Sequence, residues 1–129
     1  MVGSAYTNNL DNFPTAPDLF SIDSNSNNLY RHSTAAGDAA GSFNQLNLVR
    51  LLGITAGTSV GFDIGQDGVA YLSSANNLYT VNLTSGSATL LGPVGGSGLV
   101  SIAALAVPEA STAGVLMLTG LCALRRRRA

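Results

Sequence analysis

The stretch that decides the fold runs from residue 60 to residue 91 and reads VGFDIGQDGVAYLSSANNLYTVNLTSGSATLL. Short apolar-rich phrases alternate in it with groups of turn-forming residues. These groups are Asp-Gly at residues 67–68, Ala-Asn-Asn at 75–77 and Thr-Ser-Gly at 84–86, and their residue types favour turns. We therefore predict an antiparallel meander of four strands, which would cover residues 60–64, 69–73, 78–83 and 87–91.

Within the strand predicted at residues 78–83, Leu78 and Thr80 would face one side of the sheet. Tyr79, Val81 and Leu83 would face the other side, because successive side chains of a strand point to opposite faces. Four strands in about thirty residues have the size and pattern of one blade of a β-propeller.

The N-terminal half follows the same pattern less clearly. The predicted strands lie at residues 5–7, 19–23, 29–32 and 46–54, with residues 19–32 forming a hairpin around a polar Ser/Asn turn. The predicted loops are a proline-bearing one at residues 10–18 and a small-residue one at 34–42. The expected fold class is all-β, with antiparallel meanders that resemble about two propeller blades in a partial domain.

A weak internal repeat supports this expectation. Ala5-Tyr6 matches Ala70-Tyr71, and Leu19–Asp23 matches the phrase that begins at Leu78. Two units are too few to close a propeller, which typically needs about four to eight blades. Residues 1–12 also lack the basic and apolar regions of a signal peptide. We therefore expect the chain to be a fragment, preceded by further blades and a signal peptide.

Composition limits the possible functions. The chain has 129 residues, of which 46% are hydrophobic and 10% charged. Its first 107 residues hold two arginines against six aspartates, which argues against binding of nucleic acid. The single cysteine, Cys122, excludes an intrachain disulfide and a cysteine-based metal site.

The last 23 residues, 107–129, differ in composition from the rest of the chain. A proline-acid motif is followed by an apolar run at residues 113–124 and by a basic end. Twelve helical residues span about 18 Å, which is short for a hydrocarbon core of about 30 Å. Snorkelling arginines and local thinning of the bilayer would still allow insertion. We predict two parts, a β domain at residues 1–106 and a sorting segment with a short transmembrane helix at 107–129.

The β part contains three kinds of feature with possible chemistry, namely a serine motif, a histidine and two partial calcium loops. Gly57–Gly61 fits the G-x-S-x-G pattern around Ser59, but that nucleophile site needs a helix after the serine, and a strand is predicted there. The only histidine, His32, has no partners at ligand spacing, and we expect a solvated residue at a strand end. Asp23–Asn27 and Asp63–Gly68 match the start of a calcium loop only in part, which favours Asx turns.

The four tyrosines lie in predicted strands, and we interpret them as packing residues rather than as a carbohydrate-binding platform. The sequence therefore predicts no catalytic residue, no metal site and no cofactor in the β part. The expectation is that the chain is not an enzyme.

The segment at residues 107–129 resembles a PEP-CTERM sorting signal, in which a Pro-Glu-Pro motif precedes an apolar helix and a basic cluster. Ala110 departs from that pattern, since a third-position proline is expected there. The sorting-motif residues would be Val107, Pro108, Glu109, Ser111 and Thr112, and the basic stop would be Arg125, Arg126, Arg127 and Arg128. The resemblance implies export from a Gram-negative cell, membrane insertion, and cleavage by an exosortase, a membrane transpeptidase.

Residues 4–105 are similar to a bacterial propeller-like repeat family of unknown function. The phrases that carry this likeness are Ala5–Asn9, Leu19–Asp23, Gly61–Ile64 with Asp67-Gly68, and Asn77–Thr84. We thus expect an exported surface or extracellular-matrix protein of unknown molecular activity that contacts extracellular polysaccharide. Two alternatives remain open: a secreted hydrolase or lactonase with its active site in missing N-terminal blades, and a degenerate fragment that does not fold alone.

Overall fold

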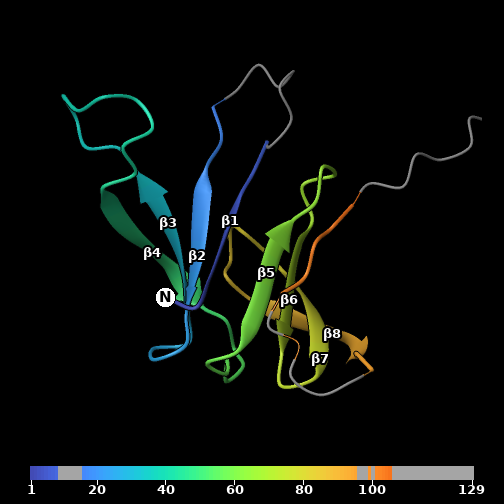
Figure 1. Ribbon diagram of the computed structural model, residues 1–129. Helices are drawn as coiled ribbons and strands as arrows, with labels where there is room; N and C mark the ends of the chain where they lie inside the picture. The colour runs from blue at the N-terminus through green and yellow to red at the C-terminus, as the bar shows by residue number, and fades with distance from the viewer. Residues whose placement is uncertain (9–15, 96–98, 100, 106–129) are drawn as a thin grey trace, which may run out of the picture.

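The computed structural model describes residues 1–8, 16–95, 99 and 101–105, which form two four-stranded antiparallel sheets (Figure 1). The first sheet contains β1 (Gly3–Tyr6), β2 (Leu19–Asp23), β3 (Asn28–Ser33) and β4 (Gln45–Leu51). The second contains β5 (Val60–Ile64), β6 (Ala70–Ser74), β7 (Asn77–Val81) and β8 (Ala88–Pro93). In both sheets the spatial order of the strands equals their order in the chain.

The all-β prediction is confirmed, and so are both ends of the strands at residues 19–23 and 60–64. The hairpin of residues 19–32 is confirmed by the pairing of β2 with β3. The strand predicted at residues 46–54 ends earlier, at Leu51, because Leu52 turns into the core and Gly53 adopts a φ of 74°. The strand predicted at 78–83 ends at Val81, because the Asn82 side chain accepts hydrogen bonds from the next turn.

The residues that the structure describes form no helix. This part of the chain therefore contains no helix that could cross a membrane. The predicted C-terminal apolar helix lies at residues 113–124, outside the described residues.

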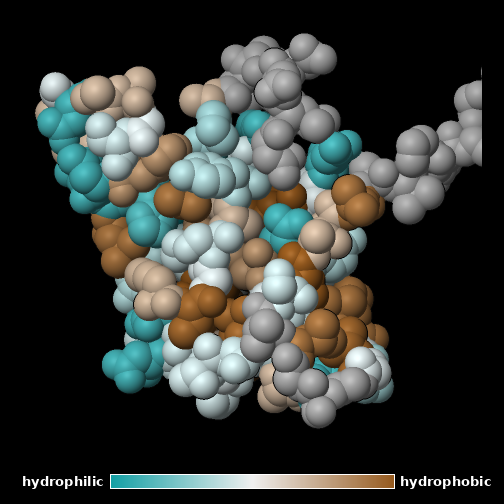
Figure 2. Space-filling view, in the orientation of Figure 1, coloured by the Kyte–Doolittle hydropathy of each residue, from teal (hydrophilic) through white to brown (hydrophobic). Residues whose placement is uncertain are grey.

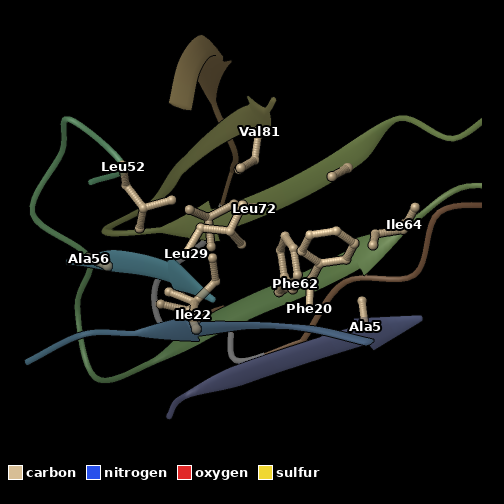
Figure 3. Packing of buried hydrophobic residues seen from close by; sticks show 12 residues of the cluster. Ala5, Phe20, Ile22, Leu29, Leu52, Ala56, Phe62, Ile64, Leu72 and Val81 are labelled. Atoms are coloured by element: carbon tan, nitrogen blue, oxygen red, sulfur yellow. The ribbon is translucent and has the colours of Figure 1, made fainter. Parts of the chain in front are cut away.

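The core lies between the two sheets, and each sheet contributes one face to it (Figure 3). The side chains of Ile22, Leu29, Leu52 and Leu72 are fully buried, at 0% exposure. Val81 belongs to this core, and the partly buried Tyr79 and Leu83 pack against it, as the alternation at residues 78–83 predicts. The remaining buried apolar residues are Ala5, Phe20, Ala56, Val60, Phe62, Ile64 and Ala70.

The sheets approach each other most closely at their first strands, β1 and β5, which lie at the centre of Figure 1. Gly3 allows this approach, because a Cβ atom there would lie 2.9 Å from Phe62 Cβ and 3.2 Å from Val60 Cγ2. The strands β4 and β8 lie at the opposite ends of the pair of sheets (Figure 1).

The internal repeat that the structure shows differs from the predicted one. Asn27–Tyr30 and Asn76–Tyr79 both read Asn-Asn-Leu-Tyr, and each leads from a turn into the third strand of its sheet. Asn27 and Asn76 have positive φ angles of 56° and 62°, and a β-bulge follows at the Leu-Tyr step in both copies.

The predicted repeat is therefore wrong by one strand. It matched Ala5-Tyr6 in β1 with Ala70-Tyr71 in β6, and the phrase of β2 with that of β7. Apolar-aromatic phrases recur in most strands of this chain, so they do not fix the alignment, whereas the Asn-Asn turn and the bulge do. The number of units, two four-stranded sheets, agrees with the prediction.

Candidate functional site

A row of three hydrogen-bonded polar side chains lies on the face of the first sheet that points away from the second. Ser4 pairs with Ser21 across β1 and β2, and the two hydroxyl oxygens lie 2.7 Å apart. The Ser21 Oγ atom lies 2.8 Å from His32 Nε2 on β3. Ser21 is only 1% exposed, so its hydroxyl exchanges hydrogen bonds with these two neighbours in place of water.

Apolar side chains flank this row on the same face. Tyr6 is 44% exposed and contacts the Phe43 ring edge-on, with ring centroids 5.6 Å apart. Leu46 and Leu48 on β4 are paired with His32 and Tyr30 and are 49% and 59% exposed. We call this surface the outer face of the first sheet; it comprises Ser4, Tyr6, Leu19, Ser21, Tyr30, His32, Leu46 and Leu48.

A serine next to a histidine is the start of a nucleophile-base pair, and the geometry allows a test of that interpretation. An activated serine must be reachable by substrate, and its histidine is oriented by a third group. Ser21 is almost fully buried, and no carboxylate among the described residues bonds to His32. The arrangement therefore satisfies a buried hydroxyl and does not activate it.

The row was not predicted from the sequence. His32 lies near the end of β3 and is partly exposed, as expected for a strand-end residue, but its Nε2 atom also bonds to Ser21. The predicted hairpin would have been enough to place Ser21 and His32 on one face of the sheet. Its turn at residues 24–27 sets Ser21 opposite Tyr30 and Leu19 opposite His32, so Ser21 and His32 share one face.

Ser59 of the G-x-S-x-G pattern lies in the bend that leads directly into β5, and its side chain is exposed. No helix follows it, so the geometry of a nucleophile elbow is not formed. The structure agrees with the interpretation of this stretch as a turn.

At the second partial calcium match, residues 63–68, both carboxylates accept hydrogen bonds from the backbone. The Asp63 Oδ2 atom accepts a hydrogen bond of 2.7 Å from the backbone N–H of Ala104. The Asp67 Oδ1 atom accepts one of 3.0 Å from Val69 N, which is an Asx turn. Within residues 1–8, 16–95, 99 and 101–105, no three acidic, histidine or cysteine side chains gather in a way that could hold a metal ion.

The first partial match, at residues 23–27, is also an Asx turn. The Asp23 carboxylate accepts hydrogen bonds from Ser26 Oγ at 2.5 Å and from Asn25 N at 3.2 Å. The hydrogen bond from Ser26, followed by that from Asn25 N, lowers the pKa of Asp23 below its ordinary value. The N-terminal amine lies 4.0 Å from the same carboxylate and adds to this effect.

We predict that Ser26→Ala raises the pKa of Asp23, because the largest stabilising contact of its charged form is removed. A carboxylate with a lowered pKa stabilises the fold above its unfolded pKa, and this contribution is lost as pH falls through the lowered value. The Ser26→Ala variant should therefore lose this turn at higher pH on acidification. An NMR titration of the Asp23 carboxyl carbon measures the shift, and Ser24→Ala is the control that should leave the midpoint unchanged.

The tyrosines divide between two roles. Tyr79 packs against the core, as predicted, whereas Tyr6 stands exposed on the outer face of the first sheet. The predicted sorting residues Val107, Pro108, Glu109, Ser111 and Thr112, and the stop at Arg125, Arg126, Arg127 and Arg128, lie outside the described residues.

Comparisons with known proteins give one match. No curated protein and no solved structure matches the chain. A family model described as "Domain of unknown function (DUF4394)" matches residues 1–106, which include every strand of both sheets. The chain therefore belongs to the DUF4394 family.

Proposed function

We propose that this chain is an exported surface or extracellular-matrix protein, sorted through residues 107–129 and cleaved there. In this proposal the β domain is the delivered cargo, and it has no catalytic role of its own. Its partners are an exosortase-type transpeptidase, the membrane before processing, and extracellular polysaccharide after it.

The observation that supports the proposal is the order of parts in the last 23 residues. The match to the family model stops at residue 106, and the proline-acid motif begins at the next residue. A residue that precedes a proline disfavours helix, so in this proposal Val107 would offer the extended backbone that a protease binds. The four arginines at the end anchor the apolar run on the cytoplasmic side.

The experiment uses the chain with a Sec signal peptide fused to Met1, expressed in a Gram-negative host with and without its exosortase. We expect a shorter product in the matrix fraction with the enzyme and an uncleaved, membrane-bound product without it. Deletion of residues 108–129 should release the protein into the medium. An unchanged distribution after this deletion would overturn the proposal.

A substitution at the one position that departs from the motif gives a second prediction. Ala110→Pro restores the Pro-Glu-Pro pattern and should raise the cleaved fraction in the same host, as measured by intact-protein mass spectrometry. Ala110→Ser is the matched control, because it changes the same site without adding the proline. Pro108→Ala should abolish cleavage. Equal cleavage in all three variants would show that the exosortase does not recognise the motif.

A further inference from the structure

The loop that joins β7 to β8 contains the one N-glycosylation sequon of the sequence. Asn82-Leu83-Thr84 fits the pattern Asn-X-Ser/Thr, with a residue other than proline at X. No other asparagine of the chain is followed by serine or threonine two residues later. Because a pattern of three residues also arises by chance, the way in which the structure presents Asn82 decides whether it can be an acceptor.

Asn82 is exposed and is held in a tight turn directly after β7. Its backbone N–H donates to Ser87 O at 2.9 Å, and its carbonyl oxygen accepts the N–H of Gly86 at 2.8 Å. Its side-chain Oδ1 atom accepts the N–H groups of Thr84 at 2.9 Å and of Ser85 at 2.8 Å. The turn therefore holds the asparagine by its backbone and by the oxygen end of its amide.

The nitrogen end of this amide is not engaged. Backbone N–H groups of Thr84 and Ser85 can only donate, so the amide must turn its oxygen toward them. No hydrogen bond joins Asn82 Nδ2 to another residue in the part of the chain that the structure describes. The two bonds to Oδ1 also stabilise the negative charge that this oxygen gains when Nδ2 gives up a proton. Asn82 thus offers an exposed amide nitrogen prepared to form a new bond.

A groove of about 480 Å³ lies beside Asn82 and suits an uncharged, hydroxyl-rich molecule. Thr80 and Thr89 are paired across β7 and β8 and line this groove together with Thr84. Their hydroxyl groups can donate and accept hydrogen bonds, as the hydroxyl groups of a sugar do. None of the described residues that line the groove is charged; the others are Gly68, Val69, Ala70, Val81 and Leu83.

We propose that Asn82 is the acceptor of an N-linked glycan, transferred from a lipid-pyrophosphate-linked oligosaccharide; the proposal rests on the proposed export of the chain. The Asn82 Nδ2 atom forms a bond to C1 of the first sugar, and the bond between C1 and the pyrophosphate oxygen breaks. The lipid pyrophosphate leaves with that electron pair, and the amide proton passes to a basic group of the transferase. The Thr84 hydroxyl is the group by which the transferase recognises the acceptor.

The position of the glycan is next to exposed apolar surface. Leu90 and Leu91 on β8 are 57% and 56% exposed. Figure 2 shows hydrophobic side chains gathered over the second sheet. Exposed apolar patches of this kind promote contact between molecules. A hydrated glycan at the start of the β7–β8 hairpin keeps such surfaces of neighbouring molecules apart.

The test expresses the full chain, with a Sec signal peptide fused to Met1, in a Gram-negative host that carries an oligosaccharyltransferase and its lipid-linked oligosaccharide. We expect one glycan on the exported chain, placed at Asn82 by intact-protein mass spectrometry and peptide mapping. Asn82→Asp should carry none, although its carboxylate can still accept both hydrogen bonds of the turn. Thr84→Ala should lower glycan occupancy about tenfold, because a hydrogen bond to the transferase is lost, and Thr84→Ser should restore it.

No glycan on the exported wild-type chain would overturn the proposal. This outcome is distinct from a failure of sorting, because glycan occupancy is measured on all exported material, whether or not residues 107–129 are cleaved. Circular dichroism checks that each variant keeps its strands.

Leu46→Thr provides a matched control for the geometry. It places a threonine two residues after Asn44 and so creates a second sequon in an exposed segment. The Asn44 Nδ2 atom donates to the Asp38 carboxylate, so its amide nitrogen is engaged. We expect occupancy at Asn44 to be about tenfold lower than at Asn82, because this hydrogen bond must break first. Equal occupancy at both sites would show that the three-residue pattern alone decides, against the proposed role of the turn.

Discussion

Replacing Leu72 by alanine should lower the free energy of unfolding by about 2–5 kcal/mol. Leu72 lies in the middle of β6, is fully buried and packs with residues of both sheets (Figure 3). The substitution removes three carbon atoms from the core and leaves a cavity that the facing strands cannot fully close. Since small domains have about 5–15 kcal/mol of stability in total, the loss is large.

Equilibrium urea unfolding followed by far-ultraviolet circular dichroism measures this change. Leu90→Ala is the control, because Leu90 is 57% exposed and its truncation should stay within about 0.5 kcal/mol of the wild type. A loss at Leu72 no larger than that at Leu90 would show that the sheets do not pack as described. A single cooperative transition of the wild type would also refute the hypothesis of a fragment that does not fold alone.

Gly86→Val should be almost as harmful, and for two physical reasons. Gly86 has a φ of 77°, a conformation that costs a residue with a side chain about 1–3 kcal/mol. A Cβ atom there would also lie 2.8 Å from Arg50 Cβ and 3.1 Å from Arg50 O on β4. Overpacking of this kind costs about 1–3 kcal/mol more.

Gly68→Val separates the two effects. Gly68 has nearly the same φ, 78°, but nothing lies within 4 Å of a Cβ atom built on it. Its variant should show only the backbone strain, so the difference between the two variants in urea unfolding isolates the contact with β4. Equal losses would mean that the turn at residues 84–86 does not pack on the first sheet.

The strands of this chain were predictable because its turns use residues with strong local preferences. Asp67-Gly68 and the predicted Ser/Asn turn at residues 24–28 place their hairpins, and the strands that follow them begin within one residue of the prediction, at Asn28 and Ala70. The end of β4 was not predictable in this way. Leu52 and Ile54 continue the apolar pattern of the strand, but they leave the sheet to pack into the core, which is a tertiary effect.

The polar row of Ser4, Ser21 and His32 was harder to predict from the sequence, because both of its hydrogen bonds join different strands. The register of β2 and β3 follows from one predicted turn, and it brings Ser21 and His32 together. Ser4 lies on β1, and the length of chain between β1 and β2 sets no register by itself. The contact of Gly61 with residues 101–102 joins parts of the chain that are far apart in the sequence. No sequence pattern near Gly61 predicts it.

The bulges at Leu29-Tyr30 and Leu78-Tyr79 have a consequence for solubility. They twist the outermost strands β4 and β8, whose free edges would otherwise be flat templates for strands of other molecules. Pro93 adds to this on β8, because it has no N–H to offer to an incoming strand. A chain with these edges can reach high local concentration and still be protected against growth into fibrils.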